Sequence, residues 1–71
     1  MIYSESLVSE VFEYIANNGI STIDEIKNTL NISEESTINA IELLIKFGLL
    51  EYNDKYGLSV MLTKTARIIL D

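Results

Sequence analysis

Apolar residues recur along most of this chain at the spacing of three and four that is typical of amphipathic helices. Residues 4–18 predict a first helix with one buried face, whose apolar positions are Leu7, Val8, Val11, Phe12 and Ile15. Ser4 is the expected N-cap. Asn18-Gly19 is the expected end, because glycine tolerates the left-handed backbone that closes many helices. Ile20 then predicts a brief extended link, one residue pair of a small sheet.

Two more helices are predicted in residues 21–30 and 33–47. The first begins at Ser21 or Thr22, and Ser33 caps the second before Gly48 ends it. Between them, Asn31 is expected in the left-handed conformation that asparagine adopts more readily than most residues. A short turn of this kind joins two helices at a fixed angle. The second of these helices has a face compatible with burial, made of Thr37, Ala40, Ile41 and Leu44.

The last third of the chain alternates between short strands and a turn. Residues 49–62 predict a hairpin, with the turn at 53–57, where Asn, Asp and Gly cluster. Thr63 is the expected cap of a final helix over residues 64–70. The expected architecture is therefore mainly α with a small β-hairpin (α+β), in one domain spanning residues 1–71. Its order is helix, short strand, helix, helix, hairpin, helix.

Three short segments carry a resemblance to a known family, and they occur in its order and at its spacing. They are Leu30-Asn31-Ile32-Ser33, Phe47-Gly48-Leu49-Leu50 and Leu62-Thr63-Lys64-Thr65-Ala66-Arg67, with Ala66 where glycine is usual. Together they make nearly the whole chain similar to the winged helix-turn-helix domain, and in particular to the MarR/PadR-like group of regulators. In that family the hairpin is called the wing, and we use the term for residues 49–62.

The resemblance implies where DNA would be contacted. The third helix of such domains enters the major groove, and the wing touches the backbone or the minor groove. Ser, Thr, Arg, Lys or Gln are usual at the groove-facing positions, and this chain keeps only Ser36 and Asn39 among them. The six corresponding positions are Glu35, Ser36, Ile38, Asn39, Glu42 and Leu43.

The charge of the chain conflicts with that implication. The net charge is −6, and it divides into −7 over residues 1–42 and +1 over residues 43–71. The third helix carries three glutamates against the single cation Lys46, whereas neutralising phosphates requires basic side chains. Glu34 and Glu35 also have a structural explanation, since acids in a first turn favour the helix dipole. Glu42 is placed to form an i, i+4 pair with Lys46.

Composition excludes several classes of chemistry. The chain has no cysteine and no histidine, so disulfides, thiolate metal sites and the usual acid–base group near neutral pH are absent. Its serines have no basic partner that would activate them. We expect no enzyme activity, no cofactor and no metal. No apolar run is long enough to span a bilayer, and no secretory signal is recognisable, which favours a soluble cytoplasmic protein without a membrane partner.

These conflicting signals favour a module that contacts another protein in transcription or chromosome-associated regulation, with weak or no DNA binding. The expected contact is a hydrophobic patch on the third helix that receives a helix or strand of the partner. Ile38 and Ile45 are equally compatible with a core position, whereas Leu43 is harder to bury. The exposed edge of the strand at 58–62 is an alternative docking site, where a strand of the partner could pair. The predicted contact residues are Glu35, Ile38, Asn39, Glu42 and Leu43.

The alternative is a homodimeric, sequence-specific DNA-binding transcriptional regulator. Base contacts would come from Ser36 and Asn39, and the dimer would form through the first helix or through Ile68, Ile69 and Leu70. An ordinary polar turn next to an ordinary helix start is the simpler explanation of the wing tip. The remaining candidate nucleic-acid contacts are Lys46, Lys55, Tyr56, Lys64 and Arg67. A third hypothesis is a purely structural dimerisation or hub module.

Overall fold

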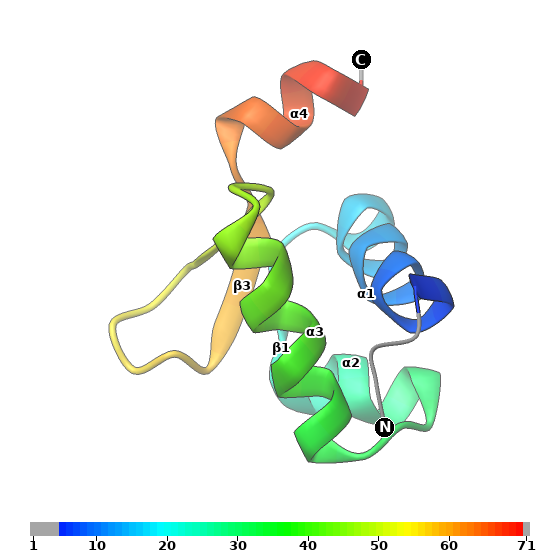
Figure 1. Ribbon diagram of the computed structural model, residues 1–71. Coiled ribbons are helices and arrows are strands. Elements are labelled where there is room, and N and C mark those ends of the chain that lie inside the picture. Colours follow the sequence, from blue (N-terminus) through cyan, green and yellow to red (C-terminus); the bar gives the residue numbers. More distant parts are fainter. Residues whose placement is uncertain (1–4, 71) are drawn as a thin grey trace.

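Four helices and a three-stranded antiparallel sheet make up the computed structural model, which describes residues 5–70. Figure 1 shows the helices grouped beside the sheet, with the hairpin loop projecting to one side. The expected cap Ser4 lies outside the described residues. The elements in chain order are α1 (Glu5–Asn18), β1 (Ser21–Thr22), α2 (Ile23–Leu30), α3 (Glu34–Lys46), β2 (Leu50–Tyr52), β3 (Ser59–Leu62) and α4 (Lys64–Leu70).

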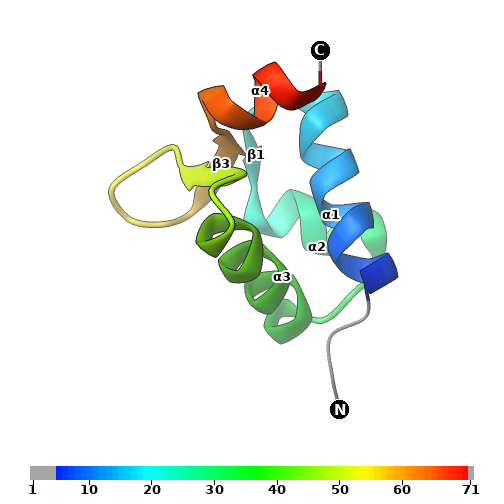
Figure 2. The same ribbon diagram turned by 45° about the horizontal axis from the view of Figure 1, so that its top comes forward.

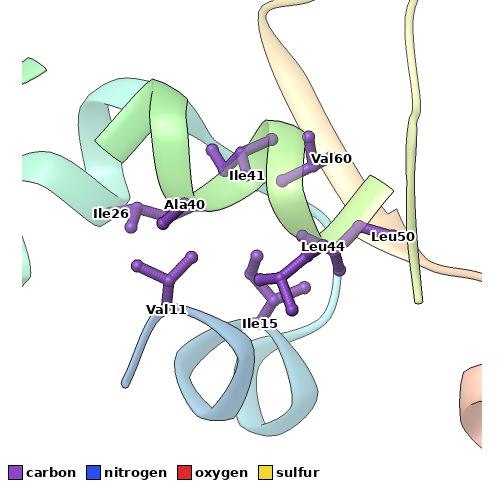
Figure 3. Packing of buried hydrophobic residues seen from close by; sticks show 8 residues of the cluster. All are labelled: Val11, Ile15, Ile26, Ala40, Ile41, Leu44, Leu50 and Val60. Atoms are coloured by element: carbon purple, nitrogen blue, oxygen red, sulfur yellow. The ribbon is translucent and has the colours of Figure 1, made fainter. Parts of the chain in front are cut away.

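The core lies where α1, α2, α3 and the sheet meet. Figure 3 shows its side chains converging from α1 on one side and α3 on the other. Burying an aliphatic side chain of this size stabilises a fold by about 1.5–3 kcal/mol, so one face of α3 is fixed firmly against α1. The buried cluster consists of Val11, Ile15, Ile26, Ala40, Ile41, Leu44, Leu50 and Val60.

Polar capping sets the start of α2. The Thr22 hydroxyl accepts from the Glu25 amide at 3.0 Å, and the Thr22 amide donates to the Glu25 carboxylate at 2.8 Å, which is a reciprocal capping box. The helix begins at Ile23, one or two residues later than the predicted start at Ser21 or Thr22. The reason is that Ser21 and Thr22 pair with β3 as strand β1.

The ends of α2 and α3 follow the left-handed turns expected from the sequence. Asn31 has φ 55° and Gly48 has φ 80°. At the end of α3, the Leu49 amide donates to the Leu44 carbonyl and the Gly48 amide to the Ile45 carbonyl, the two bonds of a Schellman motif. The chain therefore leaves α3 sharply and enters β2.

The strands run in the order β1, β3, β2, so β3 is the central strand. Leu50 pairs with Leu62 and Tyr52 with Val60 on one side, while Ser21 pairs with Val60 on the other. The prediction of an alternative docking site along the edge of residues 58–62 is therefore wrong, because β1 already pairs with that edge at Ser59 and Val60. The sequence predicted a brief extended link at Ile20 but did not predict which strand it would pair with.

Helix α4 is joined to the body through Thr63. The Thr63 hydroxyl accepts from the Ala66 amide at 3.1 Å and donates to the Gly48 carbonyl at 2.7 Å. Ala66 is the buried residue of this helix. Figure 2 shows α4 lying across the end of the molecule where the C-terminal part of α1 also lies. Among residues 5–70, no helix has the length and apolarity needed to cross a membrane.

Candidate nucleic-acid interface

The outer side of α3 presents a polar ridge, which we define as Glu35, Asn39, Glu42 and Lys46. All four are exposed. They follow one another at spacings of four, three and four, so they share one face of the helix. The buried residues Thr37, Ile41 and Leu44 occupy the opposite face. The ridge is thus presented to solvent by the same burial that fixes α3 in the fold.

Ile38 and Leu43 lie on the two flanks of this ridge. Both are half-buried, and neither belongs to the buried cluster or to the partly buried residues packed against it. Ile45 does pack against the cluster. Ile38 and Leu43 are five positions apart in the helix, so their side chains point about 140° apart around its axis. The geometry therefore divides the predicted hydrophobic patch into two apolar flanks with the polar ridge between them.

The acids of α3 have few cationic partners. Lys27 of α2 lies 3.8 Å from Glu34 and 3.7 Å from Asp24. These are the ion pairs present among residues 5–70, so the expected pair between Glu42 and Lys46 does not form. The side chains at both positions are exposed, and the attraction between solvated charges is too weak to hold long side chains together. The carboxylates of Glu35 and Glu42 on the ridge therefore have no ion-pair partner among residues 5–70.

Lys55 and Tyr56 stand together at the tip of the wing. The Lys55 ammonium lies 5.5 Å from the centre of the Tyr56 ring, within cation–π range. The Tyr56 side chain is 75% exposed. The sequence placed these two residues in a turn, and the structure brings the cation over the ring. A phosphate contact and a stacking surface are thereby offered side by side.

Sequence reasoning missed the role of Asp54 at the wing tip. Its carboxylate accepts hydrogen bonds from the Tyr56, Leu58 and Ser59 amides and from the Ser59 hydroxyl, at 2.8–3.0 Å. Desolvation raises the pKa of Asp54, but the hydrogen bonds from Ser59, Tyr56 and Leu58 outweigh it and hold the pKa below its ordinary value. The signal available in the sequence was an aspartate at the start of a turn, a position where its side chain bonds nearby amides.

The other cations lie at the base of the wing. The bond between Thr63 and the Gly48 carbonyl brings the end of α3 next to the start of α4, so Lys46 and Lys64 belong to the same end of the molecule. The Arg67 guanidinium donates to the Leu62 carbonyl at 3.3 Å. The candidate contacts therefore divide between the tip and the base.

The predicted dimer residues on α4 are well exposed. Ile68, Ile69 and Leu70 are 65%, 68% and 51% accessible. Leu70 also lines an apolar groove formed with α1 and β3, together with Ala16, Gly19, Ile20, Met61, Leu62 and Arg67. Three consecutive apolar residues of α4 are thus left largely uncovered in the single chain.

Metal-binding clusters are not found in the part of the chain that the structure describes. No three Asp or Glu side chains of residues 5–70 lie close enough to hold an ion. Every buried side-chain nitrogen or oxygen in that range has a hydrogen-bond partner. The polar groups of the described interior are thus used within the fold.

Comparison with known proteins gives structural matches only. No protein-family model matches the chain, and no curated protein matches it. A C80S mutant of MarR from E. coli superposes with a TM-score of 0.75 at 24% identity, covering 93% of this chain and 51% of the MarR chain. The same mutant complexed with operator DNA has a TM-score of 0.75 at 24% identity, with 93% and 49% covered. IdeR from T. acidophilum has a TM-score of 0.64 at 23% identity, with 99% and 34% covered.

The fold is that of a winged helix. The superpositions cover nearly all of this chain and confirm both the expected fold class and the similarity to MarR. The chain spans about half the length of the MarR chains it matches. In the winged-helix arrangement, α3 is the second helix of the helix-turn-helix and the hairpin from β2 to β3 is the wing.

Proposed function

We propose that this chain is a non-enzymatic, DNA-binding winged-helix module of a transcription regulator. The observation that carries the proposal is its superposition on a MarR mutant in complex with operator DNA. The exposed ridge of α3 and the exposed wing tip provide the two surfaces that such a module needs. A role of this kind would place the chain in the cytoplasm, on DNA.

Asn39 is the best placed residue for base contacts. It is exposed on the ridge, and an amide side chain can both donate to and accept from adenine. Ser36 is half-buried and its hydroxyl accepts from the Ser33 hydroxyl at 2.9 Å, so it is less available to contact a base. Lys46 and Lys55 would contact phosphates at the end of α3 and at the wing tip.

The glutamates of the ridge would make this binding weak, and its salt dependence would come from the lysines. A carboxylate near a phosphate opposes the release of counterions that drives association. A homodimer would compensate, because linked sites bind with a higher effective concentration. We therefore include a homodimer in the proposal, formed through the exposed α4 residues Ile68, Ile69 and Leu70.

A fluorescence-anisotropy titration tests DNA binding. A labelled duplex of random sequence is titrated with the chain at several salt concentrations. We expect saturable binding that weakens steeply with salt, and the double variant Lys46→Ala/Lys55→Ala should lower the salt slope by about two. Absence of saturable binding at low salt, or a slope that the double variant leaves unchanged, would contradict the proposal.

Sedimentation velocity tests the dimer separately. The unmodified chain should sediment as a dimer at high protein concentration, and Ile69→Glu should sediment as a monomer that keeps the helical circular-dichroism spectrum of the unmodified chain. Thr65→Glu, at an exposed polar position of the same helix, is the matched control and should leave the dimer intact. A monomeric unmodified chain would remove the dimer from the proposal but leave DNA binding to its own test.

A second candidate function is protein contact through α3. The observation that favours it is that Ile38 and Leu43 remain partly exposed beside Glu35 and Glu42 without joining the core. A photoreactive residue at position 38 or 43, introduced in the source cells, distinguishes the partners, with exposed Glu13 of α1 as the control position. Crosslinks to protein from 38 and 43 alone would favour this candidate, and crosslinks to DNA would exclude it.

A further inference from the structure

The tip of the wing is closed around one carboxylate. Oxygen Oδ1 of Asp54 accepts three bonds, from the Leu58 amide at 2.9 Å, the Ser59 amide at 2.8 Å and the Ser59 hydroxyl at 2.9 Å. Oxygen Oδ2 accepts one bond, from the Tyr56 amide at 3.0 Å. The two oxygens thus bind different parts of the loop: Oδ1 holds the returning strand, and Oδ2 holds the residue at the tip.

Polar contacts, and not burial, maintain the rest of this loop. The Asn53 amide donates to the Ser59 carbonyl at 2.9 Å, which closes the ladder before the tip. Gly57 has φ +73°, and a Cβ there would lie 3.6 Å from the Tyr52 ring. Lys55, Tyr56 and Leu58 are all exposed. Because no apolar side chain of the tip is buried, the bonds to Asp54 determine its shape.

We propose that Asp54 is the positioning residue of the wing, and that it holds Lys55 and Tyr56 in the arrangement that meets the nucleic-acid backbone. This inference rests on the proposed function. The Oδ2 bond reaches the amide of Tyr56 itself, so that oxygen holds the backbone that carries the ring lying beneath the Lys55 ammonium. The four donors also surround the negative charge of Asp54, which reduces its repulsion of a phosphate.

The substitution Asp54→Asn tests the Oδ2 bond selectively. The amide oxygen of asparagine can replace Oδ1 and keep the three bonds to Leu58 and Ser59. Its NH2 group then faces the Tyr56 amide, and two donors cannot bond each other. The variant should release the tip and leave the base of the wing in place. Faster hydrogen exchange at the Tyr56 amide, without a change at Val60, would show that the tip alone is released.

A double-mutant cycle measures whether the release matters for binding. Lys55→Ala is compared in the unmodified and the Asp54→Asn chains by anisotropy with the same random-sequence duplex at low salt. In the unmodified chain Lys55→Ala should weaken binding by about fivefold to tenfold and lower the salt slope by about one. In the Asp54→Asn chain its effect should fall to about twofold or less.

Lys46→Ala is the matched control, because Lys46 lies on α3 and away from Asp54. Its effect on binding should be the same in both chains within about twofold. A purely structural role of Asp54 would weaken binding through unfolding, which lowers all affinities by the same factor and leaves the fold-changes caused by both lysine substitutions unchanged. If Asp54→Asn does not fold, Ser59→Ala is used instead. It removes one donor from Oδ1 without changing charge, and it should produce a smaller coupling of the same sign.

The outcomes separate this inference from the proposed function. If the unmodified chain does not bind the duplex, both are wrong. If it binds and Lys55→Ala has an equal effect in both chains, Asp54 does not position the wing, while DNA binding stands. If Lys55→Ala has no effect at all, the wing makes no contact and the inference is likewise overturned. Coupling with Lys55 but not with Lys46 supports it.

Discussion

Helix α3 and the wing are held in place by different forces. Thr37, Ala40, Ile41 and Leu44 bury one side of α3 in the core, so its position does not depend on its outer ridge. The wing tip buries no large side chain and depends on hydrogen bonds to Asp54. In α3, therefore, the residues that fold the protein and those that would contact a partner are separate. At the wing tip they are adjacent in the chain.

This difference explains how the winged-helix fold can carry an acidic third helix, α3. Exposed substitutions on a helix ridge typically alter stability by about 0.5 kcal/mol or less. The charge of the ridge can therefore change without loss of the fold, and Glu35 and Glu42 are consistent with that freedom. At the wing tip, Asp54 and Ser59 have no such freedom, because their side chains make the hydrogen bonds that shape the loop.

The largest effect is expected from removing core contacts of α3. Ile41→Ala should destabilise the protein by about 2–5 kcal/mol, since Ile41 is fully buried among the core side chains and its removal leaves a cavity. For a domain of this size, that is most of the stability. Urea unfolding followed by circular dichroism measures the change.

Leu43→Ala is the matched control in the same helix. Leu43 is half-buried and outside the core cluster, so its loss should cost clearly less, about 1 kcal/mol. An equal cost for both variants would mean that Leu43 is part of the core, and that the flank of the ridge is not a contact surface.

Reversing the charge of the ridge should change binding without changing stability. The variants Glu35→Lys and Glu42→Lys each replace a repelled carboxylate with a cation, and each should strengthen DNA binding about tenfold at low salt if α3 faces phosphates. Anisotropy with a random-sequence duplex gives the affinity. Glu13→Lys on exposed α1 makes the same charge change away from the ridge. If it strengthens binding equally, net charge alone is responsible and α3 does not face the DNA.

Much of the fold could be predicted because its local signals agree with one another. The apolar spacing gave α1 and α3, and Asn31 and Gly48 adopt the left-handed conformations expected of them. Thr63 caps α4 as expected. Each of these depends on residues close together in the chain. Physical rules for caps, turns and periodicity act over the same short range.

The errors concern how residues are placed relative to one another once the elements have formed. The sequence could not show that β1 would cover one edge of β3, since two residues make too weak a strand signal. Ile38 and Leu43 were combined into one patch because both are apolar, although the helix turns them to different flanks. Asp54 was missed because the donors of the returning strand, Leu58 and Ser59, approach it only once the hairpin closes.

A smaller effect is expected at the start of α3, where a polar group does contribute to holding the helix. The Ser33 hydroxyl accepts from the Ser36 amide at 3.0 Å, and Ser33→Ala should cost about 1 kcal/mol. Ser9→Ala, on the exposed side of α1, removes a hydroxyl from a helix interior and should be neutral or slightly stabilising. Thermal unfolding compares them. Equal shifts would show that the cap of α3 contributes nothing.

The smallest effect is the acid dependence of the wing. Because the hydrogen bonds hold the pKa of Asp54 below its ordinary value of 3.8, ionised Asp54 stabilises the folded state above that pH. This contribution should be lost as the pH falls through 3.8 toward the lower folded value. The other acids titrate in both the unmodified chain and Asp54→Asn, so the difference between the two unfolding midpoints isolates Asp54. That difference should shrink on acidification. A difference that stays constant with pH would mean that the charge of Asp54 does not hold the loop.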